Sequence, residues 1–451
     1  MTGTLDIQGR WWLPEHEDHK VFGTFRWDPA TGGVLQLQGE MRPIVIKDNV
    51  LADGSVQKYR DHPSRAEKQY PVIWGQVERQ AYTLLNCFQL SVRELDLDDS
   101  IERVHVNRLL EGAWFDYPNE LDGDRVVIDL RHLTGWVNQS GLSTHHPRHD
   151  NGEADQFSVI TARILPTLRA QHGDTSVRFF QSLQEHGDHI HDVSIKQRWS
   201  LSLVADKPSP LTTFMDTASD IQDLVSIAVG ETANFDKVSL QHPALPKLSL
   251  AGTPLGNWRE DITYHAQWSN RAEPCDPVER HDMYFTLDDL GGMNGVARWL
   301  DVTDRYGTEL SRVMATRYNA TMFLEDRIMN VSAALDSFDK VRRDTGKAKV
   351  DYVDRITECI ALAGEPFTEL IAQDAREWAK SVKETRHDLA HHRERFRLNG
   401  SVGEHLQSQQ LFWLFAMCML RLADAPTAVF DRISNHAQVR WLTEQARGSD
   451  A

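Results

Sequence analysis

The chain has 451 residues, 40% of them hydrophobic and 25% charged, which is the composition of an ordinary water-soluble globular protein long enough for two or three domains. Its formal net charge of −17 argues against a nucleic-acid partner, because phosphate binding is driven mainly by Lys and Arg. Most of the negative charge lies before residue 300, however, and the C-terminal third is nearly neutral and holds a local basic cluster at Arg393, Arg395 and Arg397.

The first half of the chain has the pattern of a β-rich domain. The segments "KVFGTFRW" and "VLQLQGEM" flank the turn signal "DPATGG" and predict a hairpin over about residues 20–41. Residues 124–130, 176–183 and 197–205 are rich in β-branched and aromatic residues, as strands are. A helix is expected over about 214–230, where apolar residues share one face. We expect a sandwich or barrel with helical insertions.

The domain boundary is predicted near residues 270–282, where "SNRAEPCDPVERHD" is dense in Pro and polar residues. This boundary divides the chain into a β-rich sensing or regulatory domain at 1–275 and a helical domain at 283–445. The expected fold class is therefore α+β, with an all-α bundle after a β-rich domain.

The second half changes to helical periodicity. Apolar residues recur at three- and four-residue steps from about 306 to 341 and predict one long amphipathic helix. A second helix is expected over about 351–363, a third from Pro366 toward Arg386, and a fourth carrying the apolar run to about Ala423. We therefore expect a bundle of four or five helices.

No feature of the sequence predicts a membrane or secretory segment. The first residues have no basic stretch leading into an apolar one, and the longest apolar run, "LFWLFAMCML", is too short to cross a bilayer. The four cysteines are scattered, and Cys359 and Cys418 lie in apolar surroundings typical of buried thiols. We expect a cytoplasmic protein in a reducing compartment, with no membrane partner.

The stretch "RHDLAHHRERFR", residues 386–397, holds the densest group of candidate functional side chains. Three interpretations compete for it. His387 and His391 have the i, i+4 spacing that places two imidazoles on one zinc ion, yet no third ligand is evident. Alternatively, the charged residues simply solvate a helix end. The third interpretation is a metal-free phosphodiesterase site.

In that third interpretation Arg386 and His391 act on RNA, which carries its own nucleophile in the 2′-OH. A histidine titrating near neutrality can move the protons, and an arginine offers a fork of donors to phosphate oxygens. Five positions place the two side chains about 140° apart on a straight helix. They can meet at one phosphate only if the helix ends or kinks between them, the arginine's length bridges the gap, or a second subunit completes the site.

A family resemblance supports this third interpretation. "RHDLAH" resembles the R-x4-6-H signature of the HEPN superfamily, helical bundles many of which are metal-independent endoribonucleases. "MYFTLDDLGG" (283–292) and "LEDRIMNVSAALDSFDKV" (324–341) resemble the first segment and first long helix of the ApeA-like HEPN domain. Residues 9–41 resemble the start of the ApeA N-terminal domain.

The resemblance implies an anti-phage endoribonuclease that acts by abortive infection, triggered by an unknown phage-derived signal. It implies cleavage of host RNA, plausibly tRNA, by a homodimer whose two motifs share one cleft. It assigns catalysis to Arg386 and His391, with His387 and Asp388 in support, and no metal or cofactor. An acidic helper on the helix carrying Glu325 and Asp326 is a further expectation. The residues expected to bind the RNA backbone are His392, Arg393, Arg395 and Arg397.

Two alternatives stay open. The helical domain could be a non-catalytic HEPN module, an interaction or nucleotide-binding scaffold without cleavage. Two N-terminal histidine clusters, "STHHPRHDNGE" with His145, His146 and His149 and "QEHGDHIHD" with His186, His189 and His191, could bind a metal, although solvated loop histidines are the simpler explanation.

Overall fold

The computed structural model describes residues 4–61, 68–96, 99–115, 121–146, 159–188, 190–249, 251–267, 276–319, 321–346, 349–391 and 400–448. The chain forms two compact units. Unit 1 comprises Met1–Asp129, Val204–Phe214 and Phe235–Ser269, and unit 2 comprises Leu130–Leu203, Met215–Asn234 and Asn270–Ala451. Over the described ranges, no helix has the length and apolar content needed to cross a membrane. The division at 1–275 and 283–445 stays a prediction.

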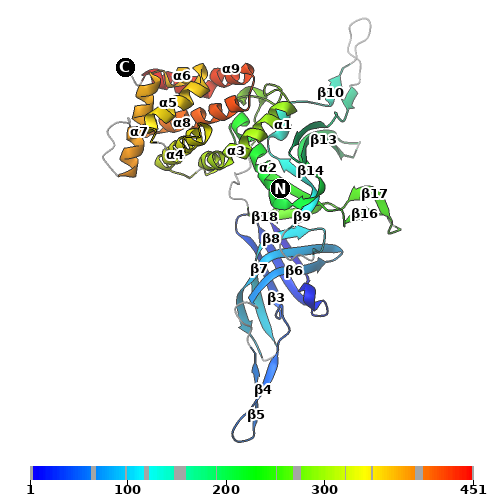
Figure 1. The fold of residues 1–451 in the computed structure, drawn as a ribbon. Coiled ribbons are helices and arrows are strands. Elements are labelled where there is room, and N and C mark those ends of the chain that lie inside the picture. The colour runs from blue at the N-terminus through cyan, green and yellow to red at the C-terminus, as the bar shows by residue number, and fades with distance from the viewer. Residues whose placement is uncertain are drawn as a thin grey trace. The chain divides into compact units, whose positions relative to one another are not determined.

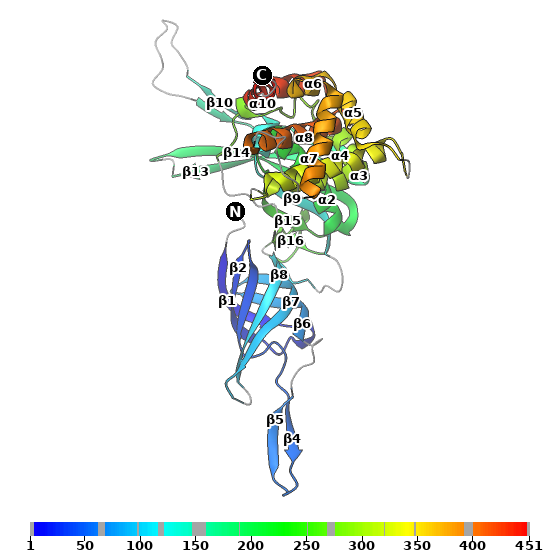
Figure 2. The same cartoon turned by 90° about the vertical axis from the view of Figure 1, so that its left-hand side faces the viewer.

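Unit 1 is built around a closed barrel of six antiparallel strands (Figures 1 and 2). The strands pair in the order β1, β2, β3, β8, β7 and β6, and β6 pairs back with β1. Closure removes the unpaired edges that an open sheet exposes. The bounds are β1 Leu5–Trp12, β2 Val21–Asp28, β3 Gly32–Gln38, β6 Gln69–Val77, β7 Gln80–Glu94 and β8 Ser100–Glu111. The hairpin predicted over 20–41 is β2 and β3, which confirms that prediction.

The barrel core explains the alternating sequence of its strands. Along β2, Val21, Phe25 and Trp27 are buried and alternate with more exposed residues. Trp11 of β1 lies opposite Gly75 of β6, and a Cβ added to Gly75 would come within 2.2 Å of the Trp11 ring. Gly75 therefore leaves the space that the Trp11 side chain fills.

Other strands of unit 1 extend this sheet or form hairpins outside it. The strands β18 (Ile262–Ala266), β15 (Phe235–Gln241) and β9 (Asp122–Leu130) follow β8 in the sheet order. Separate two-stranded sheets join β4 (Ile46–Val50) to β5 (Val56–Arg60) and β16 (Pro246–Leu248) to β17 (Pro254–Arg259). The strand predicted at 124–130 is confirmed as β9.

Unit 2 contains strands and helices. Its strands include β10 (Leu142–His145), β11 (Val159–Ala162), β12 (Leu168–His172), β13 (Thr175–Gly187) and the first part of β14 (Val193–Pro210). Its first helices are α1 (Leu133–Val137) and most of α2 (Leu211–Val229). The strands expected at 176–183 and 197–205 and the helix expected over 214–230 are confirmed as β13, β14 and α2. The expected fold class, a β-rich region followed by helices, is also confirmed.

The helices that follow are shorter and more numerous than predicted. The described part of the chain has eight helices after residue 285, namely α3 Met293–Tyr318, α4 Leu324–Arg342, α5 Tyr352–Ala363, α6 Glu365–Ile371, α7 Ala375–Ala390, α8 Gly400–Leu422, α9 Thr427–Asn435 and α10 Ala437–Gly448. The second predicted helix is confirmed as α5, which ends before Gly364, at φ 81°. The fourth is confirmed as α8, in which Cys418 is buried against Cys359 of α5.

Two predicted helices are wrong because each is divided by a turn. The long helix expected from 306 to 341 is α3 followed by α4, and Asn319 ends α3 in an extended conformation while its side chain accepts hydrogen bonds from Thr321. The third predicted helix is α6 followed by α7, because Ala372 adopts a left-handed conformation, φ 53°. Apolar periodicity continues across both turns and therefore hides them.

Candidate functional site

The candidate residues lie on α7 and at its C-terminal end. Asp374 caps the start of this helix, and its side chain accepts hydrogen bonds from the backbone N–H groups of Arg376 and Glu377 at 2.9 and 3.0 Å. Trp378 and Val382 are buried and hold one face of α7 against the bundle. The helix thus presents its remaining faces, with most of its charged residues, to the surface.

Arg386 is held between residues of two other helices. Its guanidinium carbon lies 4.8 Å from the ring centroid of Tyr352 on α5, a cation–π geometry. Its Nη1 lies 3.9 Å from Oδ2 of Asp336 on α4, a longer and weaker ion pair. The Arg386 side chain is 33% exposed. The arginine is therefore oriented by the bundle and still reaches solvent.

Tyr352 is fixed in turn by its own surroundings. Its hydroxyl donates to the carbonyl oxygen of Ser332 on α4 at 3.3 Å, and burial raises the pKa of this hydroxyl above its ordinary value. A phenol that stays protonated keeps both its hydrogen bond and a neutral ring. The ring can therefore support the Arg386 cation across the physiological pH range.

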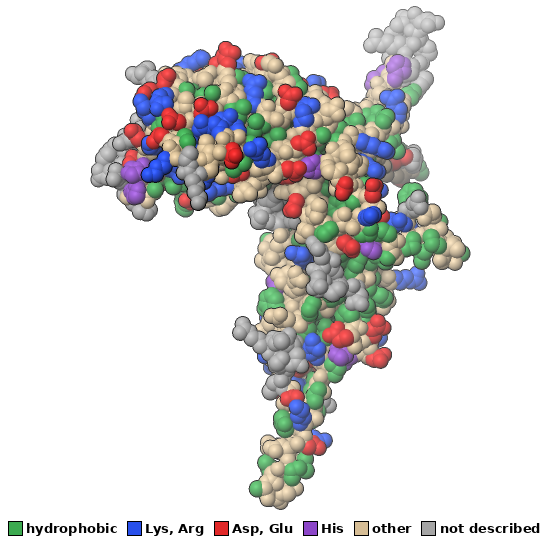
Figure 3. Space-filling model, in the orientation of Figure 1, with side chains coloured by type: hydrophobic (Ala, Val, Ile, Leu, Met, Phe, Trp, Pro, Cys, Tyr) green, Lys and Arg blue, Asp and Glu red, His purple; other side chains and the backbone are tan. Residues whose placement is uncertain are grey.

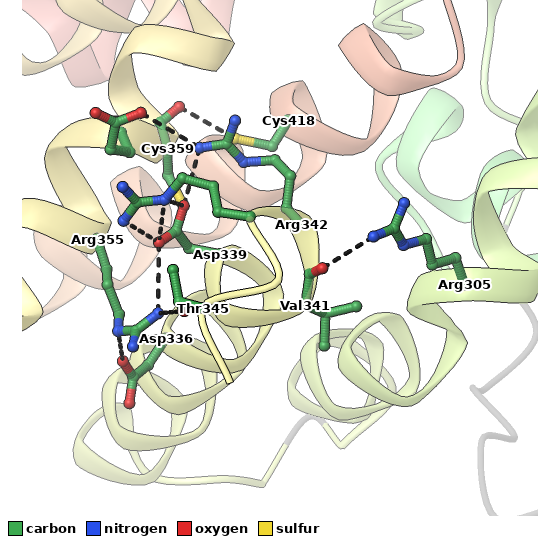
Figure 4. Close-up of polar contacts among 11 residues, drawn as sticks. Arg305, Asp336, Asp339, Val341, Arg342, Thr345, Arg355, Cys359 and Cys418 are labelled. Carbon is green, nitrogen blue, oxygen red and sulfur yellow. Dashed lines mark hydrogen bonds and ion pairs between the residues drawn. The ribbon is translucent and has the colours of Figure 1, made fainter. Parts of the chain in front are cut away.

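Asp336 connects Arg386 to a buried network of charges, drawn in Figure 4. Its Oδ1 lies 3.2 Å from Nε of Arg355. Another guanidinium nitrogen of Arg355 lies 3.6 Å from the fully buried carboxylate of Asp339. Arg342 and Arg343 also contact Asp339, at 2.9 and 2.5 Å. This network fixes the end of α4 against α5, and Arg386 lies at its margin.

His387 and His391 lie next to each other at the end of α7. Their ring centroids are 4.5 Å apart, and both side chains are exposed. The helix ends at Ala390, and His391 follows as its C-cap with φ −110° and ψ 10°, while its N–H still donates to the carbonyl oxygen of His387. The helix therefore does not end or kink between Arg386 and His391. To meet at one phosphate, the two side chains would need the length of the arginine or a second subunit.

A cavity of about 800 Å³ opens beside this end of α7. Arg386, His387 and Asp388 line it, and so do Lys383 and Lys380, one and two turns earlier. His391 is outside the set of lining residues but touches the ring of His387, which belongs to it. The cavity is large enough for a nucleotide-sized ligand.

Ion pairs offset much of the positive charge around the cavity. Lys383 pairs with Asp351 at 2.7 Å, and Arg376 pairs with Asp354 at 2.9 Å. Figure 3 shows the same pattern over the helices, where basic and acidic side chains are interspersed on the face drawn. An RNA bound here would meet a few oriented cations and not a continuous basic groove.

Several predicted residues lie outside the described residues or in another part of the bundle than Arg386. His392, Arg393, Arg395 and Arg397, expected to bind RNA, lie outside the described residues. Glu325 and Asp326 occupy the first turn of α4, and Asp336 is about 15 Å further along that helix. Asp336, and not this first turn, contributes an acid of α4 that lies beside Arg386.

Sequence reasoning missed both Asp336 and Tyr352. The three-residue spacing of Asp336 and Asp339 on an otherwise apolar stretch of helix was a signal for Asp336. Tyr352 gave none, because an aromatic residue at the start of a helix is ordinary.

The histidines do not form a metal site within the described part of the chain, where no group of three or more His, Cys, Asp or Glu side chains could hold an ion. In the N-terminal clusters, His191 contacts Asp188 at 2.6 Å, and His149 and His189 fall outside the described ranges.

Comparison with known proteins identifies the family. Searches of curated proteins and of solved structures gave no match. Residues 6–299 match the family model of the ApeA N-terminal domain 1, a range that includes the 9–41 segment in which the resemblance was noted. Because this match covers more than half of the chain, the protein belongs to the ApeA N-terminal domain family, and that membership indicates a role in anti-phage defence.

Proposed function

We propose that this protein is a metal-independent endoribonuclease of HEPN type that acts in anti-phage defence by abortive infection. Arg386 and His391 are the proposed catalytic residues, and the proposed substrate is host RNA, in particular a folded tRNA loop. The observation that carries the proposal is that Arg386, held by Tyr352 and Asp336, lines one cavity with His387, whose ring lies 4.5 Å from that of His391.

The proposed reaction uses the 2′-OH of the RNA as nucleophile. His391 removes the 2′ proton, the O2′–P bond forms, and the P–O5′ bond breaks as the 5′ oxygen takes up a proton. The products are a 2′,3′-cyclic phosphate and a 5′-OH. Arg386 stabilises the additional negative charge on the phosphorane-like transition state, and the water-exposed His387 and His391 can exchange protons with solvent.

In this proposal the remaining residues either bind the RNA or orient the catalytic side chains. The ring of His387 supports His391, and Asp388 orients an imidazole or pairs with a nearby arginine. His392, Arg393, Arg395 and Arg397 contact the RNA backbone. A homodimer brings two Arg386/His391 pairs to one cleft, so that the arginine of one protomer can serve the histidine of the other.

A second candidate is a non-catalytic HEPN scaffold that binds a protein or nucleotide without cleavage. The ion pairs of Lys383 and Arg376 favour it, because paired cations attract RNA weakly. The exposed imidazole pair favours the nuclease, because imidazoles can accept and donate the protons that the proposed reaction moves.

The test is to incubate the purified full chain with total tRNA, with and without EDTA, and with and without extract from phage-infected cells. We expect cleavage that persists in chelator and is lost in Arg386→Ala and in His391→Ala, while His281→Ala, at an exposed histidine outside the site, cleaves normally. If the wild type cleaves without EDTA but not with it, the result would indicate a metal site at His387 and His391. Absence of cleavage in all of these reactions would favour the scaffold.

The products and the assembly give independent checks. A cyclic phosphate at the new 3′ end is expected, and a 3′-OH would contradict the 2′-OH mechanism. Sedimentation should give a dimer for the wild type and for both inactive variants. In cells, Arg386→Ala and His391→Ala should relieve toxicity while the protein stays folded.

A further inference from the structure

A second cavity in unit 2 lies apart from the Arg386 site. It has a volume of about 140 Å³ and is lined by side chains from several helices, including Tyr284 before α3, Arg317 of α3, Arg327 of α4, Phe412 of α8 and Gln438 of α10. Ligand pockets for drug-sized molecules are about 300–1,000 Å³. The cavity therefore suits a small group such as a single oxyanion.

Arg317 points to the chemistry of that group. Its Nη2 donates to Oε1 of Gln409 at 2.9 Å, and its guanidinium carbon lies 3.6 Å from the ring centroid of Phe412. Within the described ranges no carboxylate forms an ion pair with Arg317. Burial lowers the pKa of this guanidinium to about 10, which reflects the cost of a cation whose contacts are neutral.

Other basic groups gather around the same point. Arg327 lines the cavity and its Nη2 donates to the carbonyl oxygen of Asn319 at 3.3 Å. The charge of Arg327 also lowers the pKa of Arg317, so the two cations repel each other. Burial, and then both arginines, lower the pKa of His405 on α8. An anion placed between these groups would relieve the repulsion.

The nearby acidic residues neutralise the positive charge of the two arginines only in part. Glu231 is an exposed residue of the cavity lining and raises the pKa of Arg317, but it does so less than burial lowers it. Asp223 accepts a hydrogen bond from the hydroxyl of Tyr318, which lines the cavity, and burial raises the pKa of Asp223 well above its ordinary value. A carboxyl that resists ionisation offers little negative charge to the arginines.

We propose that this cavity is a binding site for a phosphate-sized oxyanion, held by the guanidinium groups of Arg317 and Arg327. Arginine presents donors in a planar fork that matches phosphate oxygens, and desolvation strengthens such contacts. The ligand is either free inorganic phosphate or the phosphate of a nucleotide whose remainder lies outside the cavity. By linking α3 and α4, the anion stabilises the helix that carries Asp336.

This site does not depend on the proposed nuclease activity. Arg327 and Asp336 are nine residues apart on α4, about 14 Å along the helix axis. The phosphate-sized group that fills this cavity therefore cannot also contact Arg386. Loss of catalysis and loss of anion binding can be measured separately.

The test measures binding of inorganic phosphate and of adenosine 5′-monophosphate to the full chain by calorimetry, together with the unfolding temperature. We expect phosphate to bind and to raise the unfolding temperature of the wild type. Arg317→Gln should weaken binding by about tenfold or more and abolish that rise. Arg312→Gln, at an exposed arginine of the same helix, should bind as the wild type does.

The two arms identify the source of the anion. Equal affinity for phosphate and the nucleotide indicates that the phosphate group alone is recognised, and tighter nucleotide binding indicates a nucleotide ligand. If Arg317→Gln fails to fold, Arg327→Gln is measured instead with the same expectation. Binding of neither probe by the wild type, or unchanged binding by a folded arginine variant, overturns the proposal.

Discussion

The Arg386 guanidinium lies over the Tyr352 ring, with 4.8 Å between the guanidinium carbon and the ring centroid. Tyr352 is partly buried at the start of α5 and is tied to α4 through its hydrogen bond to the carbonyl oxygen of Ser332. Arg386 is thus restrained by the fold before any ligand arrives. A restrained arginine loses less side-chain entropy when it binds a phosphate, and this reduces the cost of forming the proposed transition state.

Replacing Tyr352 should lower the rate of the proposed cleavage by releasing Arg386. A cation–π contact is worth about 0.5–1 kcal/mol at an exposed site. Tyr352→Leu should therefore reduce the single-turnover rate by about two- to fivefold. Tyr352→Phe keeps the ring and should restore most of the rate, although it loses the hydrogen bond to Ser332.

The comparison separates positioning from folding. If Tyr352→Phe is as slow as Tyr352→Leu while both unfold at the same urea concentration, the ring does not position Arg386. If both are fully active, Arg386 needs no such support. The Arg386→Ala rate provides the lower limit on the same substrate.

The two acids of the α4 network should have different effects on stability. Asp339 is fully buried and contacts Arg342, Arg343 and Arg355, so Asp339→Asn removes a buried charge that three guanidinium groups share, while Arg355 keeps Asp336 and Arg342 keeps Glu358. Such a loss typically lowers the free energy of unfolding by about 3–5 kcal/mol. Asp336 is 39% exposed, and Asp336→Asn should cost about 1 kcal/mol or less.

Urea denaturation of both variants checks this difference. Asp336→Asn should still slow the proposed cleavage, because it removes the carboxylate that Arg386 faces. Similar losses of stability in the two variants would show that burial does not distinguish the two ion-pair sites. Full activity of Asp336→Asn would exclude a role for Asp336 in orienting Arg386.

Much of the fold could be read from the sequence because one-sided burial leaves a periodic pattern. The alternation along β2 and the turn signal after it predicted the first hairpin, and the β13, β14, α2, α5 and α8 segments were predicted from similar patterns. The breaks at Asn319 and Ala372 could not be predicted in this way. Both depend on the conformation of single residues, and the apolar spacing continues through them.

The site was predictable only where it lies in one segment of sequence. Arg386, His387 and His391 are close along the chain, so one motif was enough to propose all three. Asp336 and Tyr352 come from other helices, and their proximity to Arg386 depends on how α4 and α5 pack against α7. A single sequence carries no direct record of such tertiary contacts.

The cap of α7 should matter for both stability and activity. Asp374 accepts two backbone hydrogen bonds at the start of the helix that carries Arg386. Asp374→Ala should lower the free energy of unfolding by about 1 kcal/mol. Asp374→Ser keeps a capping oxygen and should lose only a small part of that amount. Hydrogen exchange should show faster opening of the first turn of α7 in the alanine variant. Unchanged protection there would contradict the capping role.

Asp220 of α2 should make stability depend on pH. Burial raises the pKa of its carboxyl from 3.8 to about 6. A hydrogen bond donated by Thr303 at 2.9 Å lowers this pKa and so partly offsets the effect of burial. Asp304 and Asp216 raise this pKa further, and His172 lowers it. Between about pH 4 and pH 6 the unfolded chain loses this proton while the folded chain keeps it. The free energy of unfolding therefore falls as pH rises through that window and is constant with respect to Asp220 above it.

The variant Asp220→Asn has no carboxyl proton that titrates in this range, and its amide oxygen can still accept the hydrogen bond from Thr303. The full pKa shift corresponds to about 3 kcal/mol, and partial exposure reduces the expected effect to about 1–2 kcal/mol. Relative to the wild type, Asp220→Asn should therefore gain that amount of stability between pH 4 and pH 7, as measured by urea denaturation. Asp431→Asn, at an exposed aspartate of α9, should show no such gain. A pH-independent difference between Asp220→Asn and the wild type would mean that Asp220 ionises equally in the folded and unfolded chains.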